Sequence, residues 1–489
     1  MNVLVASAEM APIARVGGMA EAVAGLVRQL RRDGLDVIVA LPDYGGVALV
    51  DEQRWELPVP QWAGPVTARA GNLDGDGPIV LIESPGSVKP HPYNDESGQA
   101  FPDNDLRFFS FSAGIAALAE QIRPDMLHLN DWHTAATLGL LADPPPTVFT
   151  IHTLAYQGVS SPEWLHRLPR SPHLFEWYGA TNPLLGAIQL ADRVVAVSPN
   201  YAREIRTEAH GMGLHHQLSA LGDRLEGVIN GIDVEEWNPA TDPHLAANFS
   251  PANIRGKAAN RTALAQTFGL ATDGPTQPII GMVSRLVGQK GIDLAVDAGR
   301  FLEHLPARLA VLGSGDAAIV DSLYALAARF PDRVGFANGY DATLSHAVFA
   351  GSDLLLMPSR FEPCGLAQMQ AMAYGTIPVV TDVGGLRDTV IDADVEPSLG
   401  TGFVSRSVDT AGMVDAMHRA VRAWKSTNRR AAIRSRGMAT DWSWAGPAGR
   451  YREIYGSLAP EHEATGGENG FEGGIEESGD LDSGDPVHE

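Results

Sequence analysis

Residues 1–42 have the sequence MNVLVASAEMAPIARVGGMAEAVAGLVRQLRRDGLDVIVALP, which contains one complete structural unit. The apolar run Val3–Ala6 predicts a strand, Met19–Arg32 predicts a helix, and Val37–Leu41 predicts a second strand that ends at Pro42. A helix between two such strands typically joins them as parallel neighbours with a right-handed crossover. The N-terminal stretch therefore predicts an α/β protein with a parallel sheet.

The same alternation continues along the chain in two series. Strands of the first series are expected at residues 126–129, 148–151 and 194–197. Strands of the second series are expected at residues 279–283, 309–312, 354–357 and 378–380. The polar stretch Asn238–Ala252 joins the two series, and we expect it to lead into a hinge. The pattern predicts two Rossmann-like, doubly wound domains that face a cleft.

The expected domain boundaries follow from this division. Residues 1–245 form the N-terminal domain and residues 246–440 the C-terminal domain, and each has a size that suits one hydrophobic core. Residues 441–457 carry large aromatic side chains and predict a last helix. Residues 458–489 are rich in glycine and acidic residues, and we expect them to form a disordered acidic tail.

The charge and composition of the chain disfavour several classes of protein. Its 489 residues carry a net charge of −23 at pH 7, which disfavours nucleic acid as a partner. No apolar run is long enough to cross a bilayer, so we expect no membrane contact. Cys364 is the single cysteine, and the N-terminal residues lack the basic region of a secretory signal. We therefore expect a cytoplasmic protein without disulfide bonds.

Two glycine pairs follow predicted strands and precede predicted helices. Gly17 and Gly18 follow the first strand, and Arg15 adds a positive charge nearby. Gly384 and Gly385 have the same setting after the strand at 378–380. Glycine lets a ligand approach the backbone, and the first amides of a helix attract anions. Each pair therefore suits a phosphate or a sugar hydroxyl, although a plain turn explains the first pair equally well.

Arg285 and Lys290 lie on one loop after the predicted strand at 279–283, and Gly291 follows them. Two cations on one loop, with a helix N-terminus behind them, suit a diphosphate. The alternative is a solvated basic loop, which the acidic composition of the chain disfavours. This loop is therefore a candidate site for an anionic ligand.

Glu362 lies at the corner between the predicted strand at 354–357 and the next helix, beside Pro363 and Gly365. A carboxylate in this place suits sugar hydroxyls or an oxocarbenium-like centre. The alternative is an acid in the first turn of a helix, where it complements the helix dipole. Cys364 is expected to be a small packed residue rather than a nucleophile.

Polar side chains also follow strands of the first series. Asp131 and His133 follow the strand at 126–129, and His152 follows the strand at 148–151. With His128, these groups are expected on the cleft side of the sheet. A zinc site is a weaker alternative, because the spacings match no usual ligand set. No Asp-x-Asp sequence follows a predicted strand as a metal–diphosphate site requires, so we expect no divalent metal.

Together these motifs resemble the bacterial glycogen synthase and plant starch synthase family, from residue 1 to about residue 457. The most specific stretch is MPSRFEPCGL at residues 357–366, and it is followed by GGLRDTV at residues 384–390. Residues 92–95, 130–133, 149–158, 230–233, 284–291 and 374–376 also match family motifs. The resemblance thus covers the whole chain except the acidic tail.

The resemblance implies the two-domain GT-B architecture, with the last helix crossing back onto the N-terminal domain. It implies a retaining glycosyltransferase that needs no metal or other cofactor. The implied reaction transfers glucose from ADP-glucose to the non-reducing end of an α-1,4-glucan, so that the partners are a nucleotide sugar and a glucan acceptor.

The family pattern also implies roles for individual residues of this sequence. Arg285 and Lys290 would bind the diphosphate, Glu362 the donor sugar, and His152 would lie against the reacting glucose. We take these four as the catalytic residues. The donor-binding residues would be Arg15, Gly17, Gly18, Tyr93, Asp131, Cys364, Gly365, Gly384 and Gly385.

The sequence departs from the family pattern mainly on the N-terminal, acceptor side. Arg15 replaces a usual lysine, Glu21 an aspartate, Thr153 an asparagine and Leu185 a lysine. These changes motivate an alternative, a related retaining glucosyltransferase with the same kind of donor and a smaller acceptor. A nucleotide-sugar-binding protein without turnover fits less well, because the four catalytic residues are present. A glucan phosphorylase would need a pyridoxal phosphate lysine and is a weaker alternative.

Overall fold

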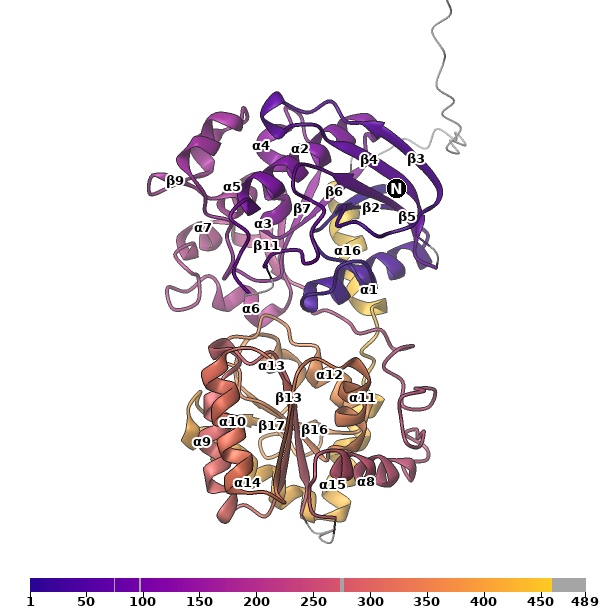
Figure 1. The fold of residues 1–489 in the computed structure, drawn as a ribbon, viewed down its shortest axis with the longest axis vertical. Helices are drawn as coiled ribbons and strands as arrows, with labels where there is room; N and C mark the ends of the chain where they lie inside the picture. Colours follow the sequence, from indigo (N-terminus) through magenta and orange to yellow (C-terminus); the bar gives the residue numbers. More distant parts are fainter. Residues whose placement is uncertain (74, 96–97, 273–276, 460–489) are drawn as a thin grey trace, which may run out of the picture.

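The computed structural model describes residues 1–73, 75–95, 98–272 and 277–459. The chain folds into two lobes, one above the other in Figure 1, and each lobe is built around one large β-sheet. Most of the acidic tail predicted at residues 458–489 lies outside the described residues. The two sheets confirm the expected α/β fold with two doubly wound parts.

The sheet of the first lobe has nine strands. In spatial order they are β11 (Leu225–Gly227), β10 (Arg193–Ala196), β7 (Thr147–Ile151), β6 (Met126–Asn130), β1 (Asn2–Ala6), β2 (Asp36–Pro42), β5 (Gly77–Glu83), β4 (Thr67–Leu73) and β3 (Val50–Glu56). Neighbours from β11 to β5 are parallel, whereas β4 is antiparallel to both β3 and β5. Strand β3 is not among the strands expected from the sequence, because it is mostly polar and exposed.

Seven α-helices and a short hairpin complete the described part of the first lobe before the chain crosses to the second. They are α1 (Gly18–Arg32), α2 (Asn104–Ile122), α3 (Trp132–Ala135), α4 (Thr137–Leu140), β8 (Glu176–Trp177), β9 (Ala180–Thr181), α5 (Pro183–Leu190), α6 (Pro199–Glu204) and α7 (His215–Ala220). In α1 the buried side chains recur at helical spacing, which places one apolar face on the sheet. These buried side chains include Ala20, Val23, Val27 and Leu30.

The sheet of the second lobe has six parallel strands. In spatial order they are β14 (Val334–Asn338), β13 (Arg308–Gly313), β12 (Ile279–Val283), β15 (Leu354–Met357), β16 (Ile377–Thr381) and β17 (Phe403–Ser405). The strand order reverses between β12 and β15, as in a doubly wound nucleotide-binding fold.

Helices cover both faces of this second sheet, which Figure 1 shows edge-on. One face carries α9 (Ile292–Gly299), α10 (Ala317–Arg329) and α14 (Thr410–Lys425). The other face carries α8 (Gly256–Thr267), α11 (Ala342–Gly351) and α15 (Thr427–Ala439). The short helices α12 (Ala367–Ala373) and α13 (Gly384–Thr389) lie at the end that faces the first lobe. Parallel strands buried on both faces explain the continuous apolar runs in the sequence.

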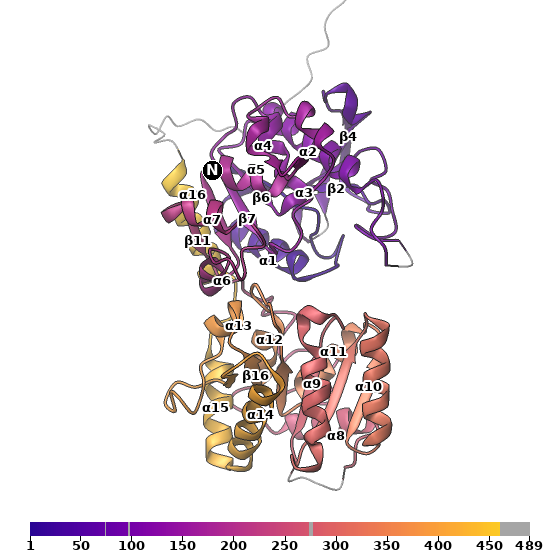
Figure 2. The same ribbon diagram turned by 90° about the vertical axis from the view of Figure 1, so that its left-hand side faces the viewer.

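The last helix, α16 (Ala445–Leu458), lies against the first lobe, as Figure 2 shows from the side. Trp444, which precedes it, packs so closely on α1 that a Cβ at Gly25 would overlap the indole ring. Tyr455 of α16 lies with its hydroxyl 2.7 Å from Nδ1 of His128 in β6. The C-terminal helix therefore contributes buried side chains to the core of the first lobe.

The chain crosses between the lobes twice, and the two crossings touch. Ile232 N donates a hydrogen bond of 2.8 Å to Trp442 O, and a Cβ at Gly231 would lie 2.7 Å from Ser443 O. The segment Asn238–Ala252, expected to lead into a hinge, packs on the second lobe, where Asp242 Oδ2 lies 2.7 Å from His346 Nδ1. Residues 231–232 and 442–443 therefore mark the place where both crossings lie side by side.

No described helix is long and apolar enough to span a membrane.

Candidate active site

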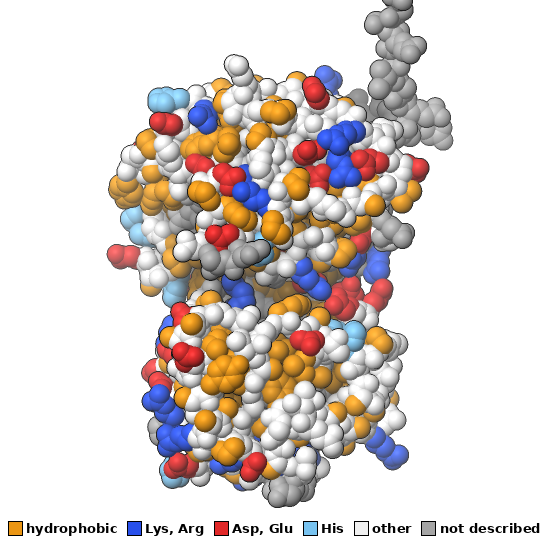
Figure 3. Space-filling model, in the orientation of Figure 1, with side chains coloured by type: hydrophobic (Ala, Val, Ile, Leu, Met, Phe, Trp, Pro, Cys, Tyr) orange, Lys and Arg blue, Asp and Glu red, His pale blue; other side chains and the backbone are white. Residues whose placement is uncertain are grey.

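The predicted site residues lie where the two sheets reverse their strand order. The reversal falls between β1 and β6 in the first lobe and between β12 and β15 in the second. Ligands of doubly wound sheets bind at such points, beyond the carboxyl ends of the strands. Gly17 and Gly18 follow β1, Asp131 follows β6, Arg285 follows β12 and Glu362 follows β15. Figure 3 shows a hollowed waist between the lobes, with Lys and Arg side chains on both sides of it.

Lys290 and Glu362 form an ion pair at the reversal point of the second lobe. Lys290 Nζ lies 2.6 Å from Glu362 Oε2, and the same oxygen accepts a hydrogen bond of 2.9 Å from Ser359 Oγ. Glu362 is buried and Lys290 is mostly buried, so their charges are less screened than those of a surface pair. The structure thus brings two of the predicted catalytic residues into direct contact.

Arg285 lies on the same loop as Lys290 but has a different environment. Its side chain is exposed, and it forms no ion pair with any other residue in the described part of the chain. The loop ends at Gly291, where φ is 63° and a Cβ would overlap Pro358 O. Close packing against the end of β15 therefore fixes the loop, while the guanidinium of Arg285 is available to an anion.

The amides of Gly384 and Gly385 are already hydrogen-bonded. Gly384 N donates to Glu204 Oε1 at 2.8 Å, and Gly385 N donates to Glu362 O at 3.1 Å. A Cβ on Gly384 would overlap Glu362 O, and one on Gly385 would overlap Cys364 O. These glycines let α13 pack against the loop of Glu362. The expectation of free amides is wrong for this structure, and a role of the two residues in donor binding stays a prediction.

The amides of the turn before α1 are also hydrogen-bonded, and their partner is Glu9, which is not among the predicted site residues. Glu9 Oε2 accepts hydrogen bonds from Val16 N and Gly17 N, both at 2.9 Å. Glu9 is buried, and its carboxylate fills the position that an external anion would take at such a turn. A Cβ on Gly18 would lie 3.7 Å from Leu366 Cδ1, so the turn lies close to the second lobe.

Tyr93 is fixed by the same carboxylate. Its hydroxyl donates a hydrogen bond of 2.7 Å to Glu9 Oε1, and its ring stacks on His133 with centroids 4.9 Å apart. Burial raises the pKa of Tyr93 and lowers the pKa of His133 to about 3. Both side chains are therefore neutral at physiological pH, and Tyr93 is held in one orientation beside the turn of Gly17.

Asp131 and His152 form a hydrogen-bonded unit at the ends of β6 and β7. Asp131 Oδ1 accepts a hydrogen bond of 2.7 Å from His152 N. His152 Nε2 lies 2.9 Å from Asn130 Oδ1, and the amide nitrogen of Asn130 donates to Ala6 O. With Asn130 in this orientation, His152 carries its proton on Nε2 and keeps a lone pair on Nδ1.

Burial shifts the pKa of both groups in this unit. It lowers the pKa of His152 to about 3, so that the imidazole is neutral at physiological pH. It raises the pKa of Asp131 to about 8, although the amides of His152 and Thr153 favour the carboxylate. Asp131 also has a φ of 54°, which is unusual for a residue with a side chain. Such strain at the end of a strand is typical of a functional position.

Two family descriptions match the chain. The starch synthase catalytic domain matches residues 2–220, and glycosyl transferases group 1 matches residues 272–437. The glycogen synthase of Halorhodospira halophila is 42% identical over 471 residues, which cover 93% of this chain and 98% of that protein. The glycogen synthase of Aromatoleum aromaticum is 40% identical, over 93% of this chain and 96% of that protein. The chain belongs to the glycogen synthase family.

Solved structures agree with this membership. The catalytic domain of starch synthase IV from Arabidopsis thaliana, bound to ADP and acarbose, has a TM-score of 0.85 and 33% identity over 94% of this chain and 99% of that one. Sucrose-phosphate synthase from Thermosynechococcus elongatus has a TM-score of 0.61 and 18% identity over 94% of this chain and 98% of that one, a likeness of fold alone. The fold is of GT-B type and the protein is a glycosyltransferase, which confirms the sequence-based identification.

Two departures from the glycogen synthase pattern are paired with each other. Arg15, in place of the usual lysine, forms an ion pair through Nε with Glu21, which replaces the usual aspartate. Arg15 Nη2 also lies 3.4 Å from Glu236 Oε1. The positive charge of Arg15 is thus compensated by two neighbouring carboxylates, those of Glu21 and Glu236. Leu185, a further departure expected from the resemblance, is buried in α5.

Tyr201, which is not among the predicted site residues, joins the two halves of the candidate site. Its hydroxyl accepts a hydrogen bond of 2.8 Å from Leu154 N, in the loop that follows His152. Its ring contacts Phe361, next to Glu362, with centroids 5.4 Å apart. Nearby, Ser198 Oγ donates a hydrogen bond of 2.6 Å to Pro363 O. Helix α6 and the residue before it therefore bridge the loops of His152 and Glu362.

His128 does not lie at the site, contrary to the expectation that it faces the cleft. It is fully buried, and its Nδ1 and Nε2 lie 2.7 Å from Tyr455 Oη and 2.8 Å from Thr150 Oγ1. Its ring also stacks on Tyr451. Because His128 lies within β6 rather than after it, its side chain serves the packing of α16 in this member of the glycogen synthase family.

Cys364 and Gly365 belong to the same loop as Glu362. Burial raises the pKa of Cys364 to about 12, so that its thiol is protonated and does not act as a nucleophile. Gly365 has a φ of 74°, and a Cβ there would lie 2.5 Å from Gln368 Oε1. Both residues thus shape the loop, and their contact with a donor stays a prediction.

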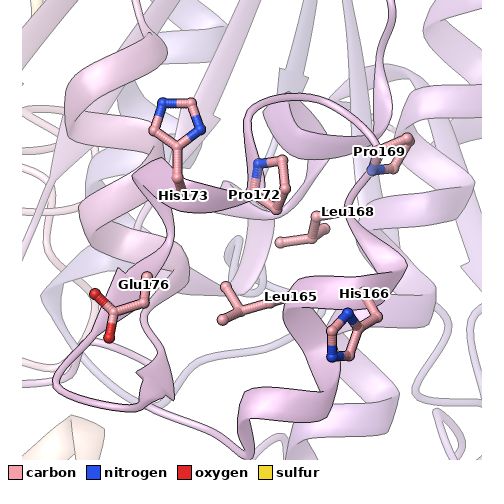
Figure 4. A pocket seen from close by; sticks show the side chains of 7 residues that line it. All are labelled: Leu165, His166, Leu168, Pro169, Pro172, His173 and Glu176. Carbon is pink, nitrogen blue, oxygen red and sulfur yellow. The ribbon is translucent and has the colours of Figure 1, made fainter.

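No group of three or more His, Cys, Asp or Glu suited to a metal ion occurs within residues 1–73, 75–95, 98–272 and 277–459. None of the predicted site residues lines the hollow in Figure 4. Its lining comes from residues 165–176 of the first lobe and includes His166, His173 and Glu176. The candidate active site of this glycogen synthase family member is therefore the facing strand ends, not this hollow.

Proposed function

We propose that the protein transfers glucose from ADP-glucose to the non-reducing end of an α-1,4-glucan with retention of the anomeric configuration. The single observation that carries this proposal is the Lys290–Glu362 pair at the strand-order reversal of the second lobe. It places a cation for a phosphate and a carboxylate for a sugar side by side, on a fold shared with glycogen synthases.

The second lobe would bind the donor. Arg285 and Lys290 would hold the diphosphate, with the N-terminus of α9 behind them. These fixed positive charges would stabilise the negative charge that develops on the leaving diphosphate. Tyr340, which follows β14 at the same edge and is 74% exposed, offers a ring on which the nucleotide base can stack.

Glu362 and His152 would act on the transferred glucose from opposite lobes. The carboxylate of Glu362 suits the sugar hydroxyls or the oxocarbenium-like centre. His152 is neutral, with its proton held toward Asn130, so its free Nδ1 can accept a hydrogen bond from a hydroxyl. Asp131 and Tyr93 are each held in place by a hydrogen bond. Asp131 accepts one from His152 N, and Tyr93 donates one to Glu9.

We further propose that the reaction needs no metal or other cofactor and takes place in the cytoplasm. Arg285 and Lys290 supply the positive charge that a metal ion provides in other nucleotide-sugar enzymes. Turnover that is unchanged by a chelator such as EDTA supports this part of the proposal, and turnover that returns only with added Mg²⁺ or Mn²⁺ contradicts it.

A nucleotide-release assay tests the reaction. Purified protein is given ADP-glucose or UDP-glucose, with and without glycogen, and the nucleoside diphosphate is measured. We expect ADP release that depends on glycogen and exceeds UDP release. Slow ADP release that glycogen does not stimulate would contradict the assignment of an α-1,4-glucan as acceptor. It would favour the alternative, a smaller acceptor. Faster release from UDP-glucose would contradict the donor.

A further inference from the structure

The first lobe carries exposed aromatic side chains outside the candidate active site. Tyr178 is 89% exposed and Tyr156 is 60% exposed, and Val159 and Met212 are exposed apolar side chains from neighbouring segments. Figure 3 shows hydrophobic side chains gathered at the edge of the upper lobe where Figure 1 places β9. We call Tyr156, Val159, Trp177, Tyr178 and Met212 the outer platform.

Hydrogen bonds and close packing hold the segments of the outer platform together. Ser160 pairs with Thr181 of β9 in an antiparallel bridge, which joins the segment of Tyr156 to the β8–β9 hairpin. Gln157 Nε2 donates a hydrogen bond of 3.0 Å to Met212 O. A Cβ at Gly213 would lie 3.1 Å from the ring of Trp177. The aromatic side chains of the outer platform therefore belong to segments that are bonded to one another, not to independent loops.

The backbone at Tyr178 is unusual for an exposed residue. Tyr178 occupies the tip of the hairpin with a φ of 48°, a region that glycine and asparagine adopt far more readily than tyrosine. Gly179 N donates a hydrogen bond of 2.7 Å to Glu176 Oε1 and so closes the turn. Neither burial nor backbone preference explains a tyrosine here, which indicates that its exposed ring has a binding role.

The outer platform is an outward continuation of the candidate active site. Tyr156 belongs to the loop that begins at His152, and Gly158 of that loop packs so closely on Trp132 that a Cβ would overlap the indole ring. Trp132 is the residue after Asp131, which binds the amide of His152. The same loop therefore links the His152 end of the site to the exposed rings.

We propose that the outer platform binds the glucan chain away from the reaction centre, with the tyrosine rings stacking on the apolar faces of glucose units. This inference rests on the proposed function. A glucan is neutral, offers C–H faces to aromatic rings and extends over many sugars, so it can reach from His152 to Tyr178. A second copy of the chain fits less well, because two molecules of net charge −23 repel each other.

The test removes the two exposed rings and separates binding from turnover. The double variant carries Tyr156→Ser and Tyr178→Asn, since asparagine tolerates the positive φ. Cosedimentation with glycogen measures binding, and ADP release measures KM and kcat with glycogen and with maltotriose. We expect glycogen binding about tenfold weaker and a correspondingly higher KM for glycogen. We expect kcat and the kinetics with maltotriose to be unchanged.

Tyr324→Ala provides a matched control, because Tyr324 is a half-exposed tyrosine of α10 in the second lobe. It should leave glycogen binding unchanged. The proposal is overturned if the double variant binds glycogen as tightly as the wild type. It is also overturned if the double variant loses as much activity with maltotriose as with glycogen. A change of oligomeric state in size-exclusion chromatography with unchanged glycogen binding assigns the surface to self-association and also overturns it.

Failure of the proposed function gives a different result. If the wild type releases no ADP with either acceptor but still cosediments with glycogen, and the double variant does not, the outer platform is supported while the reaction is wrong. Binding by cosedimentation needs no turnover, so the two outcomes are distinguishable.

Discussion

Lys290 Nζ and Glu362 Oε2 lie 2.6 Å apart, although the two residues belong to loops that follow different strands. The pair spans the point where the strand order of the second lobe reverses. Each charge compensates the other in a largely buried place before any donor binds. An arriving diphosphate would therefore share Lys290 with Glu362, which couples the binding of the leaving group to the position of the carboxylate.

Removing either member of this pair should reduce turnover severely. In Lys290→Ala the developing charge on the diphosphate loses a fixed cation, and in Glu362→Ala the sugar loses its carboxylate. Loss of one preorganised electrostatic group typically lowers kcat by about 10²–10³-fold. The measurement is glycogen-dependent ADP release, together with circular dichroism to show that each variant is folded.

A surface cation of the second lobe serves as the control for this pair. Arg329 forms an exposed ion pair with Glu303, and Arg329→Ala should leave turnover unchanged, because such pairs contribute little. Wild-type turnover in Lys290→Ala or Glu362→Ala would remove these residues from the catalytic assignment.

Glu9 is expected to position the first-lobe side of the site. In Glu9→Gln a neutral amide replaces the carboxylate, so the hydrogen bonds from Val16 N and Gly17 N lose their charge assistance and Tyr93 Oη no longer finds a carboxylate acceptor. We expect a loss of about 1–3 kcal/mol in the free energy of unfolding and a higher KM for ADP-glucose.

Urea unfolding and initial-rate kinetics check both effects of Glu9→Gln. Tyr93→Phe offers a narrower change, since it removes only the hydrogen bond to Glu9 Oε1 and keeps the ring stacked on His133. If Glu9→Gln lowers stability without changing KM, Glu9 supports the fold and not the site.

The sequence was sufficient for the buried central strands and for the placement of the main motifs, but not for strands such as β3, β4 and β5 of the first lobe. Apolar runs gave β12 at Ile279–Val283 and β15 at Leu354–Met357 as the structure has them, and the residues that follow them form the candidate site. Parallel strands end at one edge of a sheet, so motifs after strands meet without further information. In both lobes, therefore, the position of a motif directly after a strand was enough to predict that it lies at the candidate site.

The contacts within the site could not be predicted, because they depend on tertiary packing. Glycine next to a helix start suggests free amides, but the amide of Gly17 is bonded to Glu9 and the amide of Gly384 to Glu204, which is distant from it in sequence. A buried parallel strand is apolar on both faces, so the pattern does not reveal that His128 faces α16. Glu9 follows the first strand beside the glycine turn, which is the signal that could have identified it.

Stability should fall on the acid side at a higher pH than carboxylate titration alone would give. Burial lowers the pKa of His128, His133 and His152 to about 3 each. Between the ordinary value of about 6.5 and this value, the unfolded chain binds protons that the folded chain does not. Each histidine therefore contributes stability that is fully present above about pH 6.5 and falls by about 1.4 kcal/mol per pH unit below it.

His133→Phe isolates one of these contributions. The ring of His133 packs among Tyr93, Phe108 and Trp132, so phenylalanine keeps the aromatic contacts and removes the titration. Urea unfolding at pH 7 and pH 5.5 should show a smaller loss of stability for this variant than for the wild type. An identical loss would mean that His133 is protonated with little penalty in the folded protein.

Two glycines separate a packing role from a ligand role. Gly384 has a φ of 43° and no room for a Cβ beside Glu362 O, so Gly384→Ala should displace the Glu362 loop and lower both stability and turnover. Gly17 has an extended backbone, and a Cβ there meets nothing within 4 Å, so Gly17→Ala should change stability by less than about 1 kcal/mol. If a donor approaches Gly17, the added methyl group raises the KM for ADP-glucose in this otherwise stable variant. Thermal unfolding and kinetics of both variants are the measurement, and an unchanged KM in Gly17→Ala would show that this turn serves Glu9 and not the donor.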